Sequence, residues 1–105
     1  MTHSLDRLWQ TVEDRRDADP DAGWTAKLLS RGPEKCAEKF GEEAIEAVIE
    51  AVKGDRAALT REAADVLYHL CIMLASRGAT LRDVLDELDR REGLSGLAEK
   101  AARRP

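Results

Sequence analysis

The sequence has 105 residues, of which 43% are hydrophobic and 36% are charged, and its formal net charge is −4. This length predicts a single domain over residues 1–105, and the balance of apolar and charged residues is typical of a folded chain. Two Trp, one Tyr and one Phe are scattered along it. A mildly acidic chain with so few aromatic residues lacks the basic surface and the stacking platform of a nucleic-acid-binding protein, so no nucleic-acid partner is expected.

Segments for export, membrane insertion or zinc binding are not expected in this sequence. The N-terminus has no hydrophobic signal core, and the most apolar run, residues 63–75, is shorter than the ~20 residues that a bilayer requires. Cys36 and Cys71 are far apart and belong to no CxxC motif, so we expect reduced, packed thiols rather than a zinc site. The sequence therefore predicts a soluble, cytoplasmic protein.

The first third of the chain is predicted to form two helices. Apolar side chains with helical spacing follow Ser4, a suitable N-cap, and predict a helix over residues 5–17. The turn-forming residues 19–23 end this helix, and a short second helix is expected over residues 24–31. No period-two alternation typical of a strand is present in this or any later segment.

A pair of long helices is predicted in the middle of the chain. Pro33 suits a first helical turn and starts a helix that extends to Lys53. Gly54 and Asp55 then provide a stop and a new N-cap for a helix that runs to about Arg77. Because the link is so short, the two helices are expected to form an antiparallel hairpin.

The last predicted helix begins after Thr80, a suitable N-cap, and ends at Gly93. The predicted fold class is therefore all-α: an antiparallel helical bundle of four to five helices around the central hairpin. A chain this short buries only a modest core by itself, so we expect dimerisation to complete the bundle.

Acidic residues gather on one side of each helix of the hairpin. Glu43 and Glu46 lie within roughly 60° of each other around the first helix, and Glu62 and Asp65 do so around the second. Glu46 and Glu62 are each eight residues from Gly54. Glu43 and Asp65 are each eleven residues from it. If the two sides face each other, four carboxylates meet at one level of the hairpin.

Such a cluster predicts a site for a hard divalent cation. Residues 63–75 are apolar around nearly the whole helix, so this segment is expected to be buried, where a carboxylate is rarely stable unless it is paired or bound to a metal. Neighbouring carboxylates repel by on the order of several kcal/mol at an effective dielectric of 20. Mg²⁺ prefers such oxygen ligands. A di-iron site is disfavoured because His69 does not follow either acidic residue with Glu-x-x-His spacing. The alternative is that the acidic side is only a solvated surface.

Basic residues lie beside the acidic cluster. Lys35 and Lys39 continue the acidic side toward the start of their helix, and Lys27 and Arg31 come just before. Lys39 and His69 are equally far from the turn and are expected to share a level. Cations next to a metal-loaded cluster suit a polyphosphate, although the lysines are equally interpreted as exposed partners of local glutamates and His69 as a packed core residue.

The acidic motif resembles a known signature. Glu42-Glu43-x-x-Glu46, followed after fifteen residues by Glu62-x-x-Asp65, resembles the EExxE…ExxD pattern of the MazG-type all-α nucleotide pyrophosphatases. The wider sequence resembles the phosphoribosyl-ATP pyrophosphohydrolase family within that group, over nearly all of residues 5–103. The stretches that carry this resemblance are 24–29, 32–39, 41–44, 62–69 and 90–100.

The resemblance implies an Mg²⁺-dependent hydrolase that cleaves phosphoribosyl-ATP at its α–β phosphoanhydride to phosphoribosyl-AMP and pyrophosphate, the second step of histidine biosynthesis. It also implies a homodimer, and the metal ligands Glu43, Glu46, Glu62 and Asp65. For catalysis we expect Glu46 or Glu42 to orient or deprotonate the attacking water. The residues expected to bind the substrate are Lys27, Arg31, Lys35, Lys39 and His69.

Two alternative functions remain open from the sequence. One is a house-cleaning pyrophosphatase that acts on (d)NTPs and has the same metal-binding core but not the lysine-rich segment or the tail. The other is a non-catalytic helical dimerisation module, in which the acidic residues form only a solvated surface.

Overall fold

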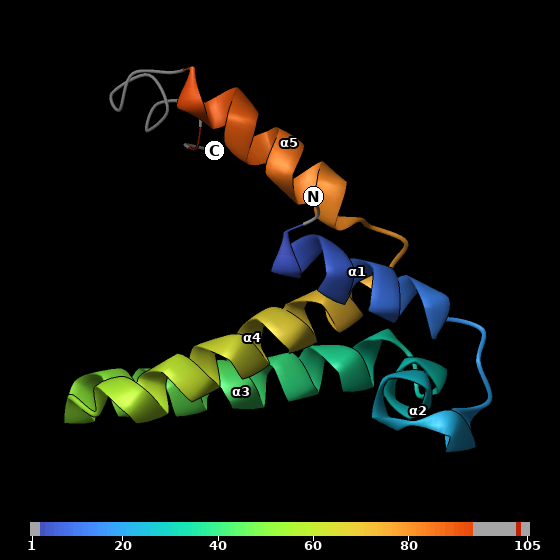
Figure 1. Cartoon of the computed structure of the whole chain (residues 1–105), viewed down its shortest axis with the longest axis horizontal. Helices are drawn as coiled ribbons and strands as arrows, with labels where there is room; N and C mark the ends of the chain where they lie inside the picture. Colours follow the sequence, from blue (N-terminus) through green and yellow to red (C-terminus); the bar gives the residue numbers. More distant parts are fainter. Residues whose placement is uncertain (1–2, 94–102, 104–105) are drawn as a thin grey trace.

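The computed structural model describes residues 3–93 and residue 103, and every regular element within them is a helix (Figure 1). The predicted all-α class is confirmed. No described helix is long and apolar enough to cross a membrane. The part of the tail resemblance that falls on residues 94–100 lies outside the described residues. The elements are α1 (Ser4–Asp14), the 3-10 turn η1 (Pro20–Ala22), α2 (Trp24–Ser30), α3 (Pro33–Lys53), α4 (Arg56–Ser76) and α5 (Leu81–Glu92).

Helices α3 and α4 form the predicted antiparallel hairpin and lie side by side along most of their length (Figure 1). Gly54 ends α3 with a φ of 81°, a left-handed conformation that a side chain disfavours. Asp55 then caps α4, because its carboxylate accepts a hydrogen bond from the backbone N–H of Ala58 at 2.9 Å. Since this two-residue link reverses the chain, residues at equal distance from the turn are brought to similar heights.

The start of α1 differs from the prediction by one residue. His3, and not Ser4, is the N-cap: its Nδ1 accepts a hydrogen bond from the N–H of Leu5 at 3.1 Å. The Asp6 carboxylate accepts one in return from the His3 N–H at 3.3 Å. The helix also ends at Asp14, before the expected boundary at residue 17. Serine is a much more usual N-cap than histidine, so residue type alone favours Ser4 over His3.

The core lies where α1 and α2 pack against the end of the hairpin that is distant from its turn. Both cysteines belong to this core and are free thiols, as expected. The Cys36 Sγ donates a hydrogen bond to the Leu28 carbonyl at 3.4 Å. Burial raises the pKa of both thiols, so neither is an activated nucleophile. The buried cluster consists of Val12, Leu28, Cys36, Cys71, Ile72 and Ala75.

The expectation that residues 63–75 are buried all round is wrong for the first half of this segment. His69, Cys71, Ile72 and Ala75 are buried, but Asp65 and Leu67 are exposed. The reason is that α1 and α2 cover only one end of the hairpin, so its turn end extends beyond them (Figure 1). Asp65 is therefore not a buried carboxylate that requires a partner, and only the geometry of the cluster favours a cation there.

Replacing Ile72 by Ala is expected to lower the free energy of unfolding by about 2–5 kcal/mol, because the side chain is fully buried and its removal leaves a cavity. The matched control is Gln10→Ala. Gln10 is exposed on α1, so its replacement should change the free energy of unfolding by less than about 0.5 kcal/mol. Urea unfolding followed by circular dichroism measures both. Equal effects of the two substitutions would contradict the placement of the core.

Candidate metal and phosphate site

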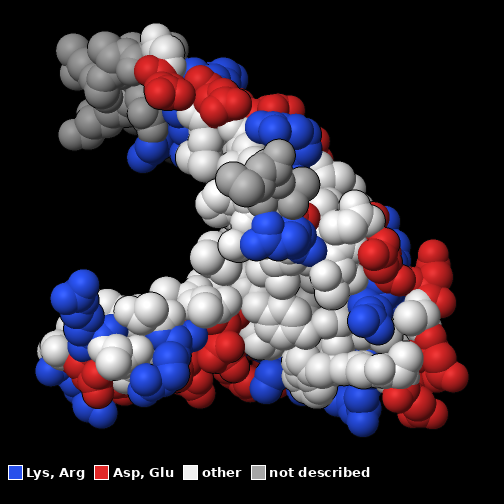
Figure 2. Space-filling view, viewed as in Figure 1, with Lys and Arg blue, Asp and Glu red and all other residues white. Residues whose placement is uncertain are grey.

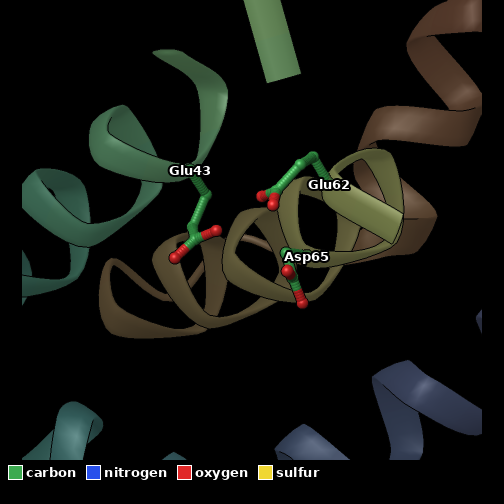
Figure 3. Close-up of side chains that lie close together, drawn as sticks. All are labelled: Glu43, Glu62 and Asp65. Atoms are coloured by element: carbon green, nitrogen blue, oxygen red, sulfur yellow. The ribbon is translucent and has the colours of Figure 1, made fainter. Parts of the chain in front are cut away.

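Three carboxylates converge between the two helices of the hairpin. Glu43 comes from α3, whereas Glu62 and Asp65 come from α4. One oxygen of each lies within 4.8 Å of those of the other two. Figure 3 shows Glu43 and Glu62 pointing toward one another, with Asp65 beside them. The structure thus brings together three of the four carboxylates that were expected to meet.

Glu46 and Glu42 flank this compact group without belonging to it. Glu46 is exposed and lies close enough to Glu43 and Glu62 to influence the pKa of both. Glu42 instead accepts a hydrogen bond from the Lys39 ammonium at 2.7 Å, and this bond lowers the pKa of Glu42. The two residues proposed from the sequence as bases are therefore in different surroundings: Glu46 is next to the cluster and Glu42 is paired with a lysine.

The cluster holds its negative charge at an energetic cost. Burial is the main reason that the pKa of Glu43 and that of Glu62 are both raised, and the nearby Glu46 carboxyl is the next. The Oε2 atom of Glu62 is buried and has no hydrogen-bond partner among the described residues. An unpaired buried acceptor beside two more carboxylates fits a hard cation with oxygen ligands, such as Mg²⁺.

His69 lies on α4 one turn beyond Asp65 and is buried. Its Nδ1 is 2.9 Å from the Asp65 carbonyl oxygen, and since a carbonyl only accepts, Nδ1 carries the proton. Nε2 is buried without a partner in the described part of the chain. The ring also lies within electrostatic range of Glu42 and Glu43, at the edge of the cluster.

Lys39 is the basic residue that the structure places nearest the site. Besides its bond to Glu42, its Nζ lies 5.9 Å from the centre of the Trp24 ring, which is half-exposed. Sequence reasoning had treated Trp24 only as a scattered aromatic. No pattern of spacing links residues 24 and 39, because they meet only through the packing of α2 on α3.

The other predicted phosphate-binding residues are less closely tied to the cluster. Lys35 forms an ion pair with Glu38 at 3.3 Å on the same helix. Lys27 on α2 and Arg31 at its C-terminal end are both exposed. Their roles toward a substrate stay predictions.

The sequence matches one family over most of its length. A family model described as phosphoribosyl-ATP pyrophosphohydrolase matches residues 5–92. Proteins named phosphoribosyl-ATP pyrophosphatase are similar to the chain: 72% identity in Cereibacter sphaeroides (strain ATCC 17025), 70% in Dinoroseobacter shibae and 68% in Paracoccus denitrificans. These alignments cover 94%, 94% and 95% of this chain, and 96%, 97% and 93% of the relatives.

Glu62→Gln is expected to stabilise the metal-free protein at neutral pH. Because folding raises the pKa of this carboxyl above its usual 4.5, the folded state favours its protonated form. The stability associated with Glu62 is therefore fully present below about pH 4.5 and is lost as the pH rises through the raised pKa. The variant should have the higher melting temperature at pH 8, and the difference should disappear toward pH 4.

The control is Glu38→Gln, which removes one charge from an exposed position of α3 outside the cluster. Its melting temperature should stay close to that of the wild type at pH 8, because exposed ion pairs contribute little. A Glu62→Gln protein that is less stable than the wild type at pH 8 would contradict the proposed repulsion.

Proposed function

The chain belongs to the phosphoribosyl-ATP pyrophosphohydrolase family, and we propose that it hydrolyses phosphoribosyl-ATP to phosphoribosyl-AMP and pyrophosphate as an Mg²⁺-dependent homodimer. This reaction is the second step of histidine biosynthesis. The observation that carries the proposal is the convergence of Glu43, Glu62 and Asp65, with a buried and unpartnered oxygen on Glu62, in a chain of this family.

Glu43, Glu62 and Asp65 would hold the cation, with Glu46 as the fourth carboxylate beside them. Bound Mg²⁺ supplies positive charge to the polyphosphate oxygens and lowers the pKa of a coordinated water. The choice of Mg²⁺ follows from the all-carboxylate donor set, because the converging ligand atoms are the oxygens of Glu43, Glu62 and Asp65.

Glu46 is the better placed of the two candidate bases. Its carboxylate is exposed to solvent and adjacent to the cluster, so it is able to accept a proton from a water at the phosphoanhydride. Glu42 is bound to Lys39, and the pKa lowered by that bond disfavours it as a base. In this arrangement Glu42 orients Lys39, whose ammonium then donates to a phosphate oxygen.

Lys35, Lys27 and Arg31 would contribute further positive charge along the phosphates. The buried Nε2 of His69 has no partner in the described chain, so a polar group of the substrate or a water is its expected partner. The family match favours phosphoribosyl-ATP over the (d)NTPs of the house-cleaning alternative. The unpartnered Glu62 oxygen argues against a purely solvated acidic surface in a non-catalytic module.

Purified protein with Mg²⁺ is expected to release pyrophosphate from phosphoribosyl-ATP with a higher kcat/KM than from any member of a dNTP panel. Glu46→Gln should lower kcat by about 10²- to 10⁴-fold, the usual contribution of a general base, whereas Glu38→Gln should not. Coupled pyrophosphate detection measures both. Rescue of a histidine auxotroph that lacks this step provides the test in cells.

Two results would contradict the assignment. A preference for dNTPs would favour the house-cleaning pyrophosphatase, and no pyrophosphate from any substrate would favour the non-catalytic module. Near-normal turnover by Glu46→Gln would remove Glu46 from the proposed mechanism but leave the reaction intact.

The homodimer is supported by an apolar side of α3 that nothing in the described chain covers. Four large side chains recur on it with helical spacing, and the most exposed, Val52, is 83% accessible. A contiguous apolar surface of this kind usually marks a protein interface. In Figure 2, uncharged surface lines the hollow between the hairpin and α5, on the side of the hairpin where Figure 1 draws α4. The exposed residues of α3 are Ile45, Val48, Ile49 and Val52.

Val48→Glu is expected to shift the protein from dimer to monomer, because it places a charge at the centre of this apolar side. Light scattering coupled to gel filtration measures the mass. The control is Gln10→Glu, which adds the same charge at an exposed position of α1 and should leave the mass unchanged. A wild-type protein that is monomeric at micromolar concentration, or a Val48→Glu variant that remains dimeric, would contradict the proposed interface.

A further inference from the structure

A cavity lies beyond the carboxylate cluster, where α1, α2 and α4 meet. Its volume is about 220 Å³. The polar part of its lining comes from three segments: Thr11 and Arg15 at the end of α1, Thr25 at the start of α2, and Tyr68 on α4. Trp24 adds a flat apolar wall. No role in the mechanism above has been given to Arg15, Thr25 or Tyr68.

The cavity and the carboxylate cluster are close enough for one ligand to reach both. Tyr68 follows Asp65 by three residues on α4, so it lies on the same side of the helix and about 4.5 Å further along its axis. Trp24 also lines the cavity and lies under Lys39, whose ammonium is bound to Glu42. The Trp24 ring therefore contacts both the cavity and the proposed phosphate-binding lysine.

Arg15 places an unpaired guanidinium at the cavity. No ion pair involves its guanidinium within the described residues. The two acidic residues before it are engaged elsewhere, since Glu13 pairs with Arg16 at 2.8 Å and Asp14 accepts a hydrogen bond from Gln10 at 2.8 Å. A guanidinium presents a planar set of N–H donors that matches the oxygens of a phosphate.

The hydroxyls in the cavity leave one proton to donate. Thr25 and Tyr68 are hydrogen bonded to each other, which uses the proton of one of them and leaves the proton of the other free. The Thr11 hydroxyl donates to the Arg7 carbonyl at 3.0 Å and has only lone pairs left. The Arg15 guanidinium and one hydroxyl proton together form a set of hydrogen-bond donors suited to a small anion.

We propose that this cavity binds the 5-phosphate of the phosphoribosyl group, which is the part of the substrate that ATP lacks. This inference rests on the proposed function. Phosphoribosyl-ATP carries a triphosphate at one end, a second phosphate on the ribose attached to its adenine, and the purine between them. The carboxylate cluster and Lys39 face the triphosphate, Arg15 and the hydroxyl pair face the second phosphate, and the Trp24 ring lies between the two anionic ends.

Arg15 is therefore a specificity-determining residue, and its role is separate from the bond that breaks. A nucleoside triphosphate without the phosphoribosyl group leaves the Arg15 guanidinium in water, so it gains nothing from the cavity. Phosphoribosyl-ATP adds a charge-assisted hydrogen bond there. The cavity thus selects this substrate over ATP and the dNTPs by binding energy alone.

Arg15→Gln is expected to raise the KM for phosphoribosyl-ATP by about ten- to a hundredfold, the range for loss of a hydrogen bond to a charged group, with kcat nearly unchanged. Without metal, calorimetry should show that its affinity for phosphoribosyl-AMP falls by the same factor while its affinity for AMP does not change. Arg16→Gln is the matched control, because this neighbour pairs with Glu13 and does not line the cavity. Arg15→Lys keeps the charge without the fork and should recover part of the affinity.

Two outcomes would overturn the subsite. In one, Arg15→Gln has the same KM and the same phosphoribosyl-AMP affinity as Arg16→Gln. In the other, the affinities of Arg15→Gln for AMP and for phosphoribosyl-AMP fall by the same factor. If Arg15→Gln alters the melting curve, Tyr68→Phe provides a second test, because it removes a hydroxyl but keeps the ring. This variant should also bind phosphoribosyl-AMP more weakly, with its affinity for AMP unchanged. A wild-type protein that does not hydrolyse phosphoribosyl-ATP would refute the proposed function, whereas an active wild type with an unaffected Arg15→Gln variant refutes only the subsite.

Discussion

Mutual repulsion among carboxylates is the constraint on which the rest of the molecule depends. One carboxylate oxygen of each of Glu43, Glu62 and Asp65 lies within 4.8 Å of the other two, although charged carboxylates repel one another. What holds them is the hairpin of α3 and α4, which is itself fixed by the core that α1 and α2 complete at one end. The free energy of that core thus maintains an arrangement of carboxylates that the proposed cation would relieve.

Much of this arrangement was predictable because it depends on local rules. The caps Asp55 and Thr80 accept the backbone hydrogen bonds that their residue types favour, and Gly54 adopts the left-handed turn that ends α3. With the turn fixed, equal distance from it places Glu43 and Asp65 at similar heights, and they meet because the two acidic sides face each other. The cap at His3 was missed because a histidine seldom fills that position.

What could not be predicted depends on how helices that are distant in sequence pack together. The exposure of Asp65 and Leu67 follows from α1 and α2 covering only one end of the hairpin, and no periodicity in residues 63–75 records that limit. Helix rotation likewise decides that Glu46 flanks the compact group rather than joining it. The cavity that contains Arg15 and Tyr68 combines three segments whose spacing in sequence carries no signal.

The brevity of the link at Gly54 and Asp55 also limits how this sequence can change. Surface connections between helices normally tolerate insertions and deletions well. Here, one residue added to the start of α4 would turn every later side chain by about 100° around the helix axis. Glu62 and Asp65 would then face away from Glu43. The number of residues between this turn and Glu62 is therefore as strictly constrained as the identity of the acidic residues.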